Sequence, residues 1–290
     1  MRIADLLTET ARKLATAGID DARCEARLLV GHACGKTHSQ LLLAAGDKTT
    51  FEQRRALAPL VARRLRREPF AYIAQEQEFW SLPFFVDRNV LIPRPETEFL
   101  IEQALAAALA PTAPRPGLIC DLCCGSGIIA VVLAKELRRH VLAIDISPAA
   151  LTVTQRNARR HGQEGQIWPL AADLFAALTP RPLFSLVVSN PPYVSLAELA
   201  AGLQPEVALF EPRLALDGGD EGLQIIARIR RILPKFLLPG GEVFMEIGYS
   251  QGAAVLALFK CKIPDCRDFS EVEILKDYAG HDRIVHARLA

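Results

Sequence analysis

The sequence predicts an α/β protein: an open, mostly parallel β-sheet with helices on both faces, preceded by a small helical domain. Three observations indicate this class. Apolar residues recur at helical spacing from Ile3 to about Arg67. From Leu118 onwards, short apolar strand patterns alternate with helical patterns, which is the order typical of parallel sheets. Acidic residues follow three of these strand patterns, at the edge where such sheets bind ligands.

The composition is that of a folded protein without a strong overall charge. Half of the 290 residues are apolar and the formal net charge is +1, so no global attraction to nucleic acid or to an anionic membrane is expected. The seven cysteines lack zinc-finger spacing, so we expect neither a disulfide framework nor a metal site. No signal-peptide pattern and no apolar run of membrane-spanning length occurs, so a cytoplasmic protein is predicted.

Residues 1–75 are predicted to form the helical domain. Glycines separate its helical stretches, at Gly18, Gly31, Gly35 and Gly46. The last helix ends in the basic cluster Arg63-Arg64-Leu65-Arg66-Arg67. Such a cluster could face a phosphate backbone or an acidic protein, but a solvated helix face is the favoured interpretation, because charge runs usually only solvate.

Residues 76–93 are predicted to form a β-hairpin that links the two domains. Two apolar, β-rich runs flank Asp87-Arg88-Asn89, which we interpret as the connector of the hairpin. The aromatic residues Phe79 and Trp80 in the first run are expected to pack between the domains rather than to stack on a base.

Residues 94–290 are predicted to form the sheet domain. It opens with an alanine-rich helix that ends near Ala110, followed by a loop from Pro111 to Gly117. Ser147 and Pro148 supply the N-cap and the first residue of a later helix. The expected strands are Leu118–Leu122, Val141–Asp145, Gln166–Leu170, Phe184–Ser189 and Glu242–Ile247, with a closing pair at Glu271–Leu275 and Arg283–Ala287.

A glycine-containing loop follows the first of these strands and opens a helix. Its pattern is Asp121-x-x-x-Gly125-x-Gly127, with Cys123, Cys124 and Ser126 between the named residues. The glycines allow the backbone to approach a ligand closely, and the helix N-terminus presents free N–H groups. This loop is therefore the predicted cofactor loop.

Three acidic residues surround the same predicted pocket. Asp145 ends the second strand and is placed to accept both hydroxyls of a ribose, while Asp173 follows the third strand and can accept an adenine amino group beside the apolar wall of Leu174. Asp121 could accept from an ammonium group. Because three acids disfavour a pyrophosphate and favour a cation, we expect S-adenosylmethionine, with S-adenosylhomocysteine as its product.

The fourth strand leads directly into Asn190-Pro191-Pro192-Tyr193. Two consecutive prolines end the strand in a stiff turn that exposes a backbone carbonyl, and the Asn190 side chain adds a second acceptor beside the aromatic face of Tyr193. Two acceptors and a stacking face suit a planar NH2 group, whose methylation needs positioning rather than a charged base. We therefore predict N-methylation, with Asn190 and Pro191 as catalytic residues. The alternative is an ordinary turn after a strand.

Several motifs in order along the chain resemble the bacterial release-factor glutamine N5-methyltransferases (PrmC/HemK). The resemblance covers essentially the whole chain, and its motifs are Glu78-Phe79-Trp80-Ser81, Leu91-Ile92-Pro93-Arg94-Pro95-Glu96-Thr97-Glu98, Asp121-Leu122-Cys123-Cys124-Gly125-Ser126-Gly127, Asn190-Pro191-Pro192-Tyr193 and Phe210-Glu211-Pro212-x-x-Ala215-Leu216-x-Gly218-Gly219. Asn-Pro-Pro-Tyr alone is also found in enzymes that methylate amino groups of nucleic acids, whereas the second and the last motif are more specific.

The resemblance implies a Rossmann-like class I methyltransferase domain that uses S-adenosylmethionine. It implies that the substrate is the glutamine of the Gly-Gly-Gln motif in class-1 peptide chain release factors, and that the helical domain helps to hold that factor. It implies cofactor contacts at residues 123–127, Asp145 and Asn190, and a glutamine site formed by Asn190, Pro191, Pro192 and Tyr193. The chain departs from the family at two places: Cys123-Cys124 stand where similar proteins often have glycine and threonine, and Leu174 stands where they often have tryptophan or phenylalanine.

Two other functions remain open at this point. The same tetrapeptide could hold the exocyclic amine of adenine for N6-methylation of DNA or RNA, although the near-neutral charge and the lack of a long basic domain disfavour stable nucleic-acid binding. A cofactor-binding scaffold without catalysis is the other alternative. Further candidates have structural explanations that are at least as good. Arg94 and Thr97 could line the cofactor tail, or they could serve as hairpin exit and helix cap. Glu206 and Glu211 could lie near the glutamine pocket or form loop ion pairs.

Overall fold

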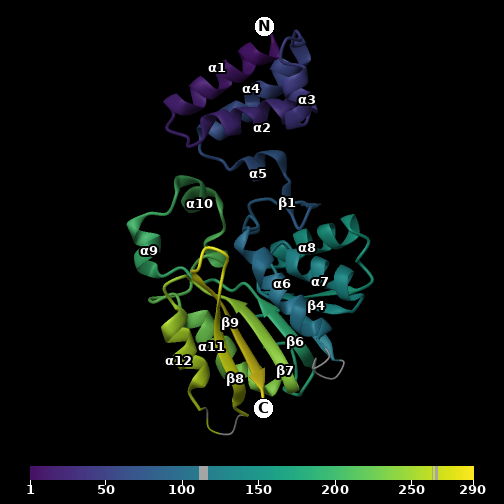
Figure 1. The fold of residues 1–290 in the computed structure, drawn as a ribbon, viewed down its shortest axis with the longest axis vertical. Helices are drawn as coiled ribbons and strands as arrows, with labels where there is room; N and C mark the ends of the chain where they lie inside the picture. Colours follow the sequence, from purple (N-terminus) through teal and green to yellow (C-terminus); the bar gives the residue numbers. More distant parts are fainter. Residues whose placement is uncertain (111–116, 263, 265–266) are drawn as a thin grey trace. The chain divides into compact units, whose positions relative to one another are not determined.

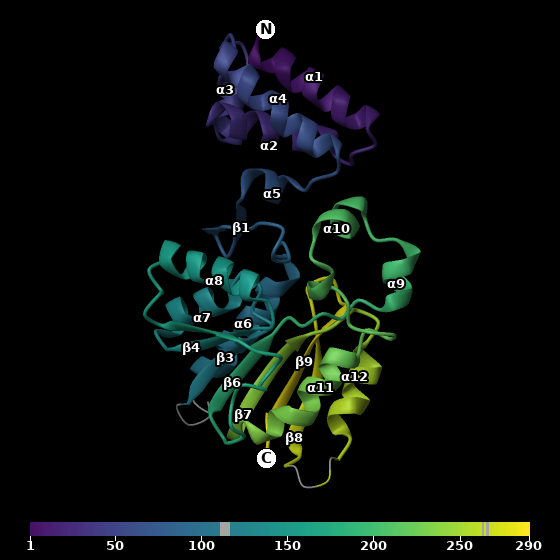
Figure 2. The same ribbon diagram turned by 180° about the vertical axis from the view of Figure 1, so that it is seen from behind.

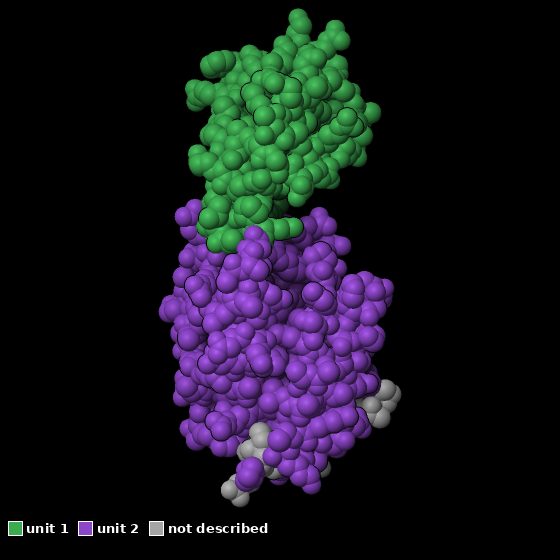
Figure 3. Space-filling view, turned by 90° about the vertical axis from the view of Figure 1, so that its left-hand side faces the viewer, with its two compact units in different colours: residues 1–76, 204–210 green, residues 77–203, 211–290 purple. Residues whose placement is uncertain are grey.

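The computed structural model describes residues 1–110, 117–262, 264 and 267–290, and these residues form two compact units (Figure 3). The first unit comprises Met1–Glu76 together with Gln204–Phe210, and the second comprises Gln77–Leu203 and Glu211–Ala290. The sequence-based division had placed residues 204–210 in the sheet domain. Most of the loop expected from Pro111 to Gly117 lies outside the described residues.

The first unit is helical (Figure 1). Its core consists of apolar side chains that recur at helical spacing, such as Ile3, Leu6 and Leu14 on the first helix. The helices of this unit are α1 (Ile3–Thr16), α2 (Ala22–Cys34), α3 (His38–Leu43), α4 (Phe51–Leu65), α5 (Phe70–Ala74) and α10 (Pro205–Phe210).

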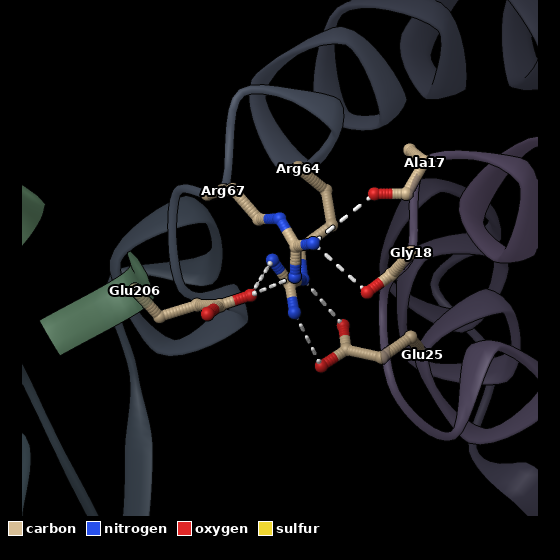
Figure 4. A network of polar contacts seen from close by, with 6 residues as sticks. All are labelled: Ala17, Gly18, Glu25, Arg64, Arg67 and Glu206. Atoms are coloured by element: carbon tan, nitrogen blue, oxygen red, sulfur yellow. Dashed lines mark hydrogen bonds and ion pairs between the residues drawn. The ribbon is translucent and has the colours of Figure 1, made fainter. Parts of the chain in front are cut away.

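Arg63, Arg64 and Arg67 of the basic cluster at the end of α4 are paired with carboxylates, so the expectation of a solvated helix face was wrong for these three, whereas Arg66 is exposed. Figure 4 shows the pairs of Arg64 and Arg67. The Arg64 guanidinium is buried and donates to Glu25 on α2 and to Glu206 on α10, at 3.0 and 2.9 Å. Arg67 also donates to Glu206, at 3.2 Å, and to the backbone oxygens of Ala17 and Gly18. These bonds join α10 to the helices of the first unit.

The second unit opens with a short hairpin of β1 (Gln77–Phe79) and β2 (Leu82–Phe84), paired antiparallel. Its turn is Trp80-Ser81, where both residues have positive φ angles of 55° and 53°. A hairpin is present in the expected stretch, but the assignment of its turn to Asp87-Arg88-Asn89 was wrong. Two left-handed residues match the twist of a two-residue hairpin, and this geometry can be adopted without glycine. Residues 87–89 instead form a separate turn after the hairpin.

Within the described residues, seven strands form one sheet in the order β5-β4-β3-β6-β7-β9-β8. All neighbouring pairs are parallel up to β7, and β9 pairs antiparallel with both β7 and β8. The strands are β3 (Leu118–Leu122), β4 (Val141–Asp145), β5 (Ile167–Ala171), β6 (Phe184–Ser189), β7 (Leu237–Glu246), β8 (Phe269–Lys276) and β9 (Asp282–Leu289). The predicted α/β class with a mostly parallel sheet is confirmed.

Helices cover both faces of this sheet, as Figures 1 and 2 show. Side chains alternate between the faces: Ile119 belongs to the cluster that contains α6 (Glu96–Leu109), α7 (Ile128–Leu137) and α8 (Pro148–Arg160), whereas Cys120 belongs to the opposite cluster. The opposite cluster contains α11 (Gln224–Ile232) and α12 (Gly252–Lys260). The remaining elements are α9 (Leu196–Ala201) and the 3₁₀ helices η1 (Arg213–Ala215) and η2 (Leu233–Lys235).

The register of the central strands brings the ends of three strands to one edge of the sheet. Leu122 pairs with Ser189, and Ser189 pairs with Met245. The next residues along the three strands are Cys123, Asn190 and Glu246, which therefore meet at the carboxyl edge of the sheet. In the described parts of the chain, no helix has both the length and the apolar character needed to cross a bilayer.

Candidate active site

A cavity of about 250 Å³ lies in the second unit, at the carboxyl ends of β3, β4 and β6. It is bounded by the predicted cofactor loop, by the start of α6 and by the segment after Glu211. Its lining includes Asn89, Arg94, Thr97, Cys123, Cys124, Gly125, Ser126, Asp145, Asp173, Leu174, Asn190, Pro192, Pro212, Leu214, Ala215 and Arg228. Most of the site residues that were predicted from the sequence thus line one cavity.

The two glycines of the cofactor loop serve different purposes. At Gly125, with φ +52°, an added Cβ would meet no protein atom within 4 Å, so the backbone there is open to a ligand. At Gly127, with φ +77°, an added Cβ would lie 2.7 Å from the Thr154 side chain on α8. Gly125 therefore suits close approach of a ligand, whereas Gly127 permits packing of the loop against α8 and is not part of the cavity lining.

Side chains of α8 hold this loop in place. Thr154 donates to the Gly125 carbonyl at 2.9 Å, and the buried Asn157 donates to the Ser126 carbonyl at 2.8 Å. Asn157 also bonds both backbone groups of Phe85, just after the hairpin. Sequence reasoning missed Asn157, although a polar residue on the buried face of a predicted helix is a usable signal.

Asp145 lines the cavity at the end of β4. Its Oδ2 accepts from the Gly125 N–H at 2.8 Å and its Oδ1 from the Ser147 N–H at 2.9 Å. Burial raises the pKa of this carboxyl. Each oxygen retains a lone pair beyond these bonds, so the group can accept from a pair of ligand hydroxyls.

Asp173 and Leu174 lie on the cavity wall after β5. The exposed Asp173 carboxylate forms an ion pair of 2.6 Å with Arg228 of α11, which also lines the cavity. Leu174 is buried and has a positive φ of 52°, an uncommon conformation for a leucine. Sequence reasoning missed Arg228, which fixes the orientation of Asp173.

Asp121 points away from the cavity. Its carboxyl group is buried, its Oδ2 accepts from the Ala130 N–H in the first turn of α7 at 2.9 Å, and burial raises its pKa to about 8. It is not among the lining residues. The geometry supports a role in anchoring α7 to β3 rather than the predicted contact with a ligand ammonium group.

Asn190 is connected to a buried network. Its Nδ2 donates to Thr97 Oγ1 at 3.1 Å, and Thr97 donates in turn to Glu246 Oε2 at 2.8 Å. Tyr193 donates its hydroxyl proton to Glu246 Oε1 at 3.0 Å. Thr97 and Glu246 are almost wholly buried. Sequence reasoning missed Glu246, although a carboxylate at the end of the apolar strand β7 is a visible signal.

The other residues of the tetrapeptide have distinct positions. Pro192 lines the cavity, whereas the buried Pro191 and the largely buried Tyr193 are not among its lining residues. Burial raises the pKa of the Tyr193 hydroxyl well above its ordinary value, so the phenol stays protonated. The tetrapeptide thus presents the Asn190 side chain to the cavity and keeps the phenol as an internal donor.

The segment from Glu211 to Gly222 supports this turn. Val194 and Leu216 bond through their backbones, and Gly218 donates to the Val194 carbonyl at 2.9 Å. Gln251, the N-cap residue of α12, donates to the Tyr193 carbonyl at 2.9 Å. The predicted Glu-Pro…Gly-Gly motif therefore braces the Asn-Pro-Pro-Tyr turn.

The remaining candidates form ion pairs. Arg94 lines the cavity and contacts the nearly buried Glu211 at 2.6 Å, whereas Glu206 belongs to the first unit and pairs with Arg64 and Arg67. Glu206 and Glu211 therefore both form ion pairs, which was one of the two interpretations that the sequence left open. Among the described residues, no three His, Cys, Asp or Glu side chains gather in a way that could hold a metal ion.

Comparison with known proteins gives two family matches and several full-length relatives. The model of the PrmC N-terminal domain matches residues 5–74, and that of the methyltransferase small domain matches residues 97–208. The release factor glutamine methyltransferase of Cereibacter sphaeroides is 41% identical over 290 residues, which is 100% of this chain and 99% of that protein. The release factor glutamine methyltransferase of Geobacter sulfurreducens is 39% identical, over 99% of this chain and 96% of that protein.

One solved structure supports the fold. A methyltransferase from Pyrococcus furiosus has a TM-score of 0.50 and 13% sequence identity, over 82% of this chain and 98% of that chain. At this level of identity the likeness concerns architecture alone. Together, the sheet order, the cavity at its carboxyl edge and the full-length relatives show that this chain belongs to the release factor glutamine methyltransferase family, with a Rossmann-like class I methyltransferase domain.

Proposed function

We propose that this protein uses S-adenosylmethionine to methylate N5, the side-chain amide nitrogen, of the glutamine in the Gly-Gly-Gln motif of class-1 peptide chain release factors, and that it acts in the cytoplasm. The observation that carries this proposal is the placement of Asn190 on the cavity wall with its N–H group already bonded to Thr97. Its Oδ1 therefore remains as an acceptor, which is the partner that a carboxamide NH2 group requires.

The residues around the cavity fit this cofactor. The backbone at Gly125 is open, Asp145 keeps lone pairs for two ribose hydroxyls, and Asp173 can accept from an adenine amino group. Leu174 offers an apolar contact where relatives of this family often have an aromatic residue. When bound, S-adenosylmethionine would supply an electrophilic methyl group on a positively charged sulfur.

The chain's own residues would position the substrate amide. In this proposal the two N–H groups of the glutamine side chain donate to the Asn190 Oδ1 and to the backbone carbonyl that joins Pro191 to the cavity-lining Pro192. The prolines make the turn rigid, so the amide nitrogen is held with one face toward the methyl donor, which lowers the barrier through positioning and electrostatics. The extra proton on the methylated nitrogen is lost afterwards to solvent.

The proposal needs no charged general base at the nitrogen. Within the described residues, Glu246 is the only carboxylate hydrogen-bonded to this network. Its two oxygens already accept from Thr97 and Tyr193. An amide nitrogen is a poor base, and its proton becomes acidic only once the methyl group is attached. Holding the amide in place is therefore the principal task of the site.

The decisive experiment is incubation of the protein with labelled S-adenosylmethionine and a purified class-1 release factor, followed by mass spectrometry. We expect a single methyl group on the glutamine of the Gly-Gly-Gln peptide, and none on a release factor in which that glutamine is replaced by alanine. Label on another residue, or no label, contradicts the substrate assignment.

The same assay with a DNA or RNA oligonucleotide addresses the alternative enzyme. The near-neutral net charge of +1 gives little general attraction to a phosphate backbone. We therefore expect no methyl transfer to adenine. Transfer to an oligonucleotide with a steep dependence on salt would instead favour N6-adenine methylation over the proposed reaction.

A further inference from the structure

Glu246 is a buried carboxylate that takes no direct part in the proposed reaction. It stands at the end of β7 with no exposed surface, and it accepts one hydroxyl proton on each oxygen: from Thr97 at 2.8 Å and from Tyr193 at 3.0 Å. Thr97 is also the partner of Asn190, at 3.1 Å. A continuous chain of hydrogen bonds therefore runs from a wholly buried carboxyl group to the side chain that lines the cavity.

Proton counting fixes the direction of this chain. A threonine hydroxyl has one proton and can accept through its lone pairs. Because an ionised Glu246 has only lone pairs, the Thr97 proton must point to it. Toward Asn190, Thr97 can then act only as an acceptor, so Asn190 must turn its NH2 end inward. The Oδ1 end is left for the cavity.

We propose that Glu246, acting through Thr97, is a positioning residue that determines which end of the Asn190 carboxamide faces the substrate. This inference rests on the proposed amide methylation, because only a substrate with N–H groups to donate requires an oxygen at that place. With the carboxamide reversed, two NH2 groups would face each other without an acceptor. Tyr193, bonded to the other oxygen of Glu246, is held by the same group.

The charges around Glu246 come from β9, from α6 and from the loop between β8 and β9. Arg283 at the start of β9 favours its ionised form, and Arg283 is itself paired with Asp277 at 3.1 Å, whereas Glu96 at the start of α6 opposes ionisation. Burial outweighs the favourable contacts and raises the pKa of Glu246 above its ordinary value. Protonation would supply a competing donor, release the Thr97 proton and allow Asn190 to reverse.

Three substitutions test whether Glu246 and Thr97 position Asn190: Glu246→Gln, Thr97→Val and Thr97→Ser. Gln keeps the shape of Glu246 but brings a donor, and Val keeps the shape of Thr97 without its hydroxyl group. We expect both to lower kcat for release-factor methylation about 100-fold, the size of effect that misplacement at a reacting centre produces. The cofactor Kd, measured by calorimetry, should change much less. Thr97→Ser retains the hydroxyl and should recover most of the rate.

The pH profile separates positioning from a merely structural role. For the wild type, kcat should fall toward acid with an inflection above the ordinary glutamate range, and in Thr97→Val this inflection should disappear. Thr10→Val, at a buried threonine of the first unit, controls for loss of a buried hydroxyl. An unchanged kcat in Thr97→Val, or a Thr97→Ser variant as impaired as Thr97→Val, overturns the inference.

The outcomes distinguish the two proposals. A wild-type protein that transfers no methyl group to the release factor contradicts the proposed function, whereas an active wild type with unaffected variants contradicts only the role of Glu246. Should Glu246→Gln fail to fold, the comparison of the two Thr97 variants tests the inference, because both leave the Glu246 carboxyl group in place.

Discussion

At the scale of single residues, Asn190 has to donate on one side and accept on the other. Replacing it with alanine removes both functions, and replacing it with aspartate removes the donor that Thr97 requires. For both variants we expect kcat to fall by about 100-fold or more, with a smaller change in the affinity for S-adenosylmethionine. Single-turnover methylation of the release factor and calorimetric titration of the cofactor measure these two quantities. An active alanine variant would leave Asn190 without a catalytic role.

Asp121 makes the stability of the second unit depend on pH. Its pKa rises from an ordinary 3.8 to about 8 because it is buried, so the folded state holds a proton that the unfolded state releases. This carboxyl therefore contributes most stability below pH 4, and the contribution is lost as pH rises toward 8. The loss amounts to at most about 1.4 kcal/mol per pH unit.

Asp121→Asn tests this dependence. Its oxygen can still accept from the Ala130 N–H, but the amide does not titrate. We expect the free energy of unfolding of the variant to vary less between pH 5 and pH 8 than that of the wild type, as measured by denaturant titration at several pH values. Parallel curves for the two proteins would show that Asp121 is ionised when folded.

Much of the site follows from the order of residues, because loops after parallel strands meet at one edge. Gly125, Asp145, Asp173, Leu174 and Asn190 all line the cavity, as the positions after strands predicted. The direction of a side chain is harder to predict. Asp121 shares a strand face with Ile119, two residues earlier, and that face packs on α7. Alternation along β3 would have predicted its inward position.

At the scale of elements, the turn after β6 requires a glycine at position 222, which packs closely against the backbone of Tyr193. Gly222 has φ +72°, and an added Cβ would overlap the Tyr193 carbonyl and the Gln251 side chain. Gly240 has the same φ of +72°, but nothing lies within 4 Å of an added Cβ. An alanine at either position would have to adopt a left-handed conformation, which costs about 1 to 2 kcal/mol. Only the alanine at position 222 would also clash with neighbouring atoms.

We expect Gly240→Ala to lose only this stability and to keep its methylation rate. Gly222→Ala should lose more stability and also kcat, because the backbone of Tyr193 must move. Thermal unfolding and release-factor methylation of the two variants form a matched comparison. Equal rates in both would mean that the position of the Tyr193 carbonyl does not matter for the reaction.

The helix α10 provides a second prediction at this scale. Glu206 is the group through which α10 bonds Arg64 and Arg67, and Arg64 is only 5% exposed. Glu206→Gln removes the charge and should lower the free energy of local opening of residues 204–210 by about 1 to 3 kcal/mol. Faster proteolysis in this segment measures the change. Glu9→Gln, in an exposed pair with Lys13, should have little effect.

Element types were predictable where apolar periodicity is strong, and contacts between distant segments were not. The strands of the sheet unit follow their sequence patterns closely, whereas the helices α9 and α12 were not predicted. The hairpin turn was misplaced because Trp80 and Ser81 take left-handed conformations without any glycine to signal them. The inclusion of α10 in the first unit depends on ion pairs across more than a hundred residues of sequence, which local pattern cannot indicate.

At the scale of the whole molecule, the two units have separate cores, so a cofactor bound by one should not stabilise both equally. At a concentration of S-adenosylmethionine 100 times its Kd, the second unit gains about 2.7 kcal/mol by mass action. We expect slower hydrogen exchange in β3, β4 and β6 and little change in α1, α2 and α4. Mass spectrometry of the exchanged full-length protein shows the difference directly. Uniform protection of both units would indicate one cooperative structure.

The position of β9 has a consequence for biosynthesis. This strand is translated after β8 yet lies between β7 and β8, so β8 has no other partner in the described sheet. Until β9 has left the ribosome, β7 keeps an unpaired edge and β8 has nothing to pair with. The strand β8 can therefore pair only after β9 has been translated, so this side of the sheet is completed by the last residues to leave the ribosome.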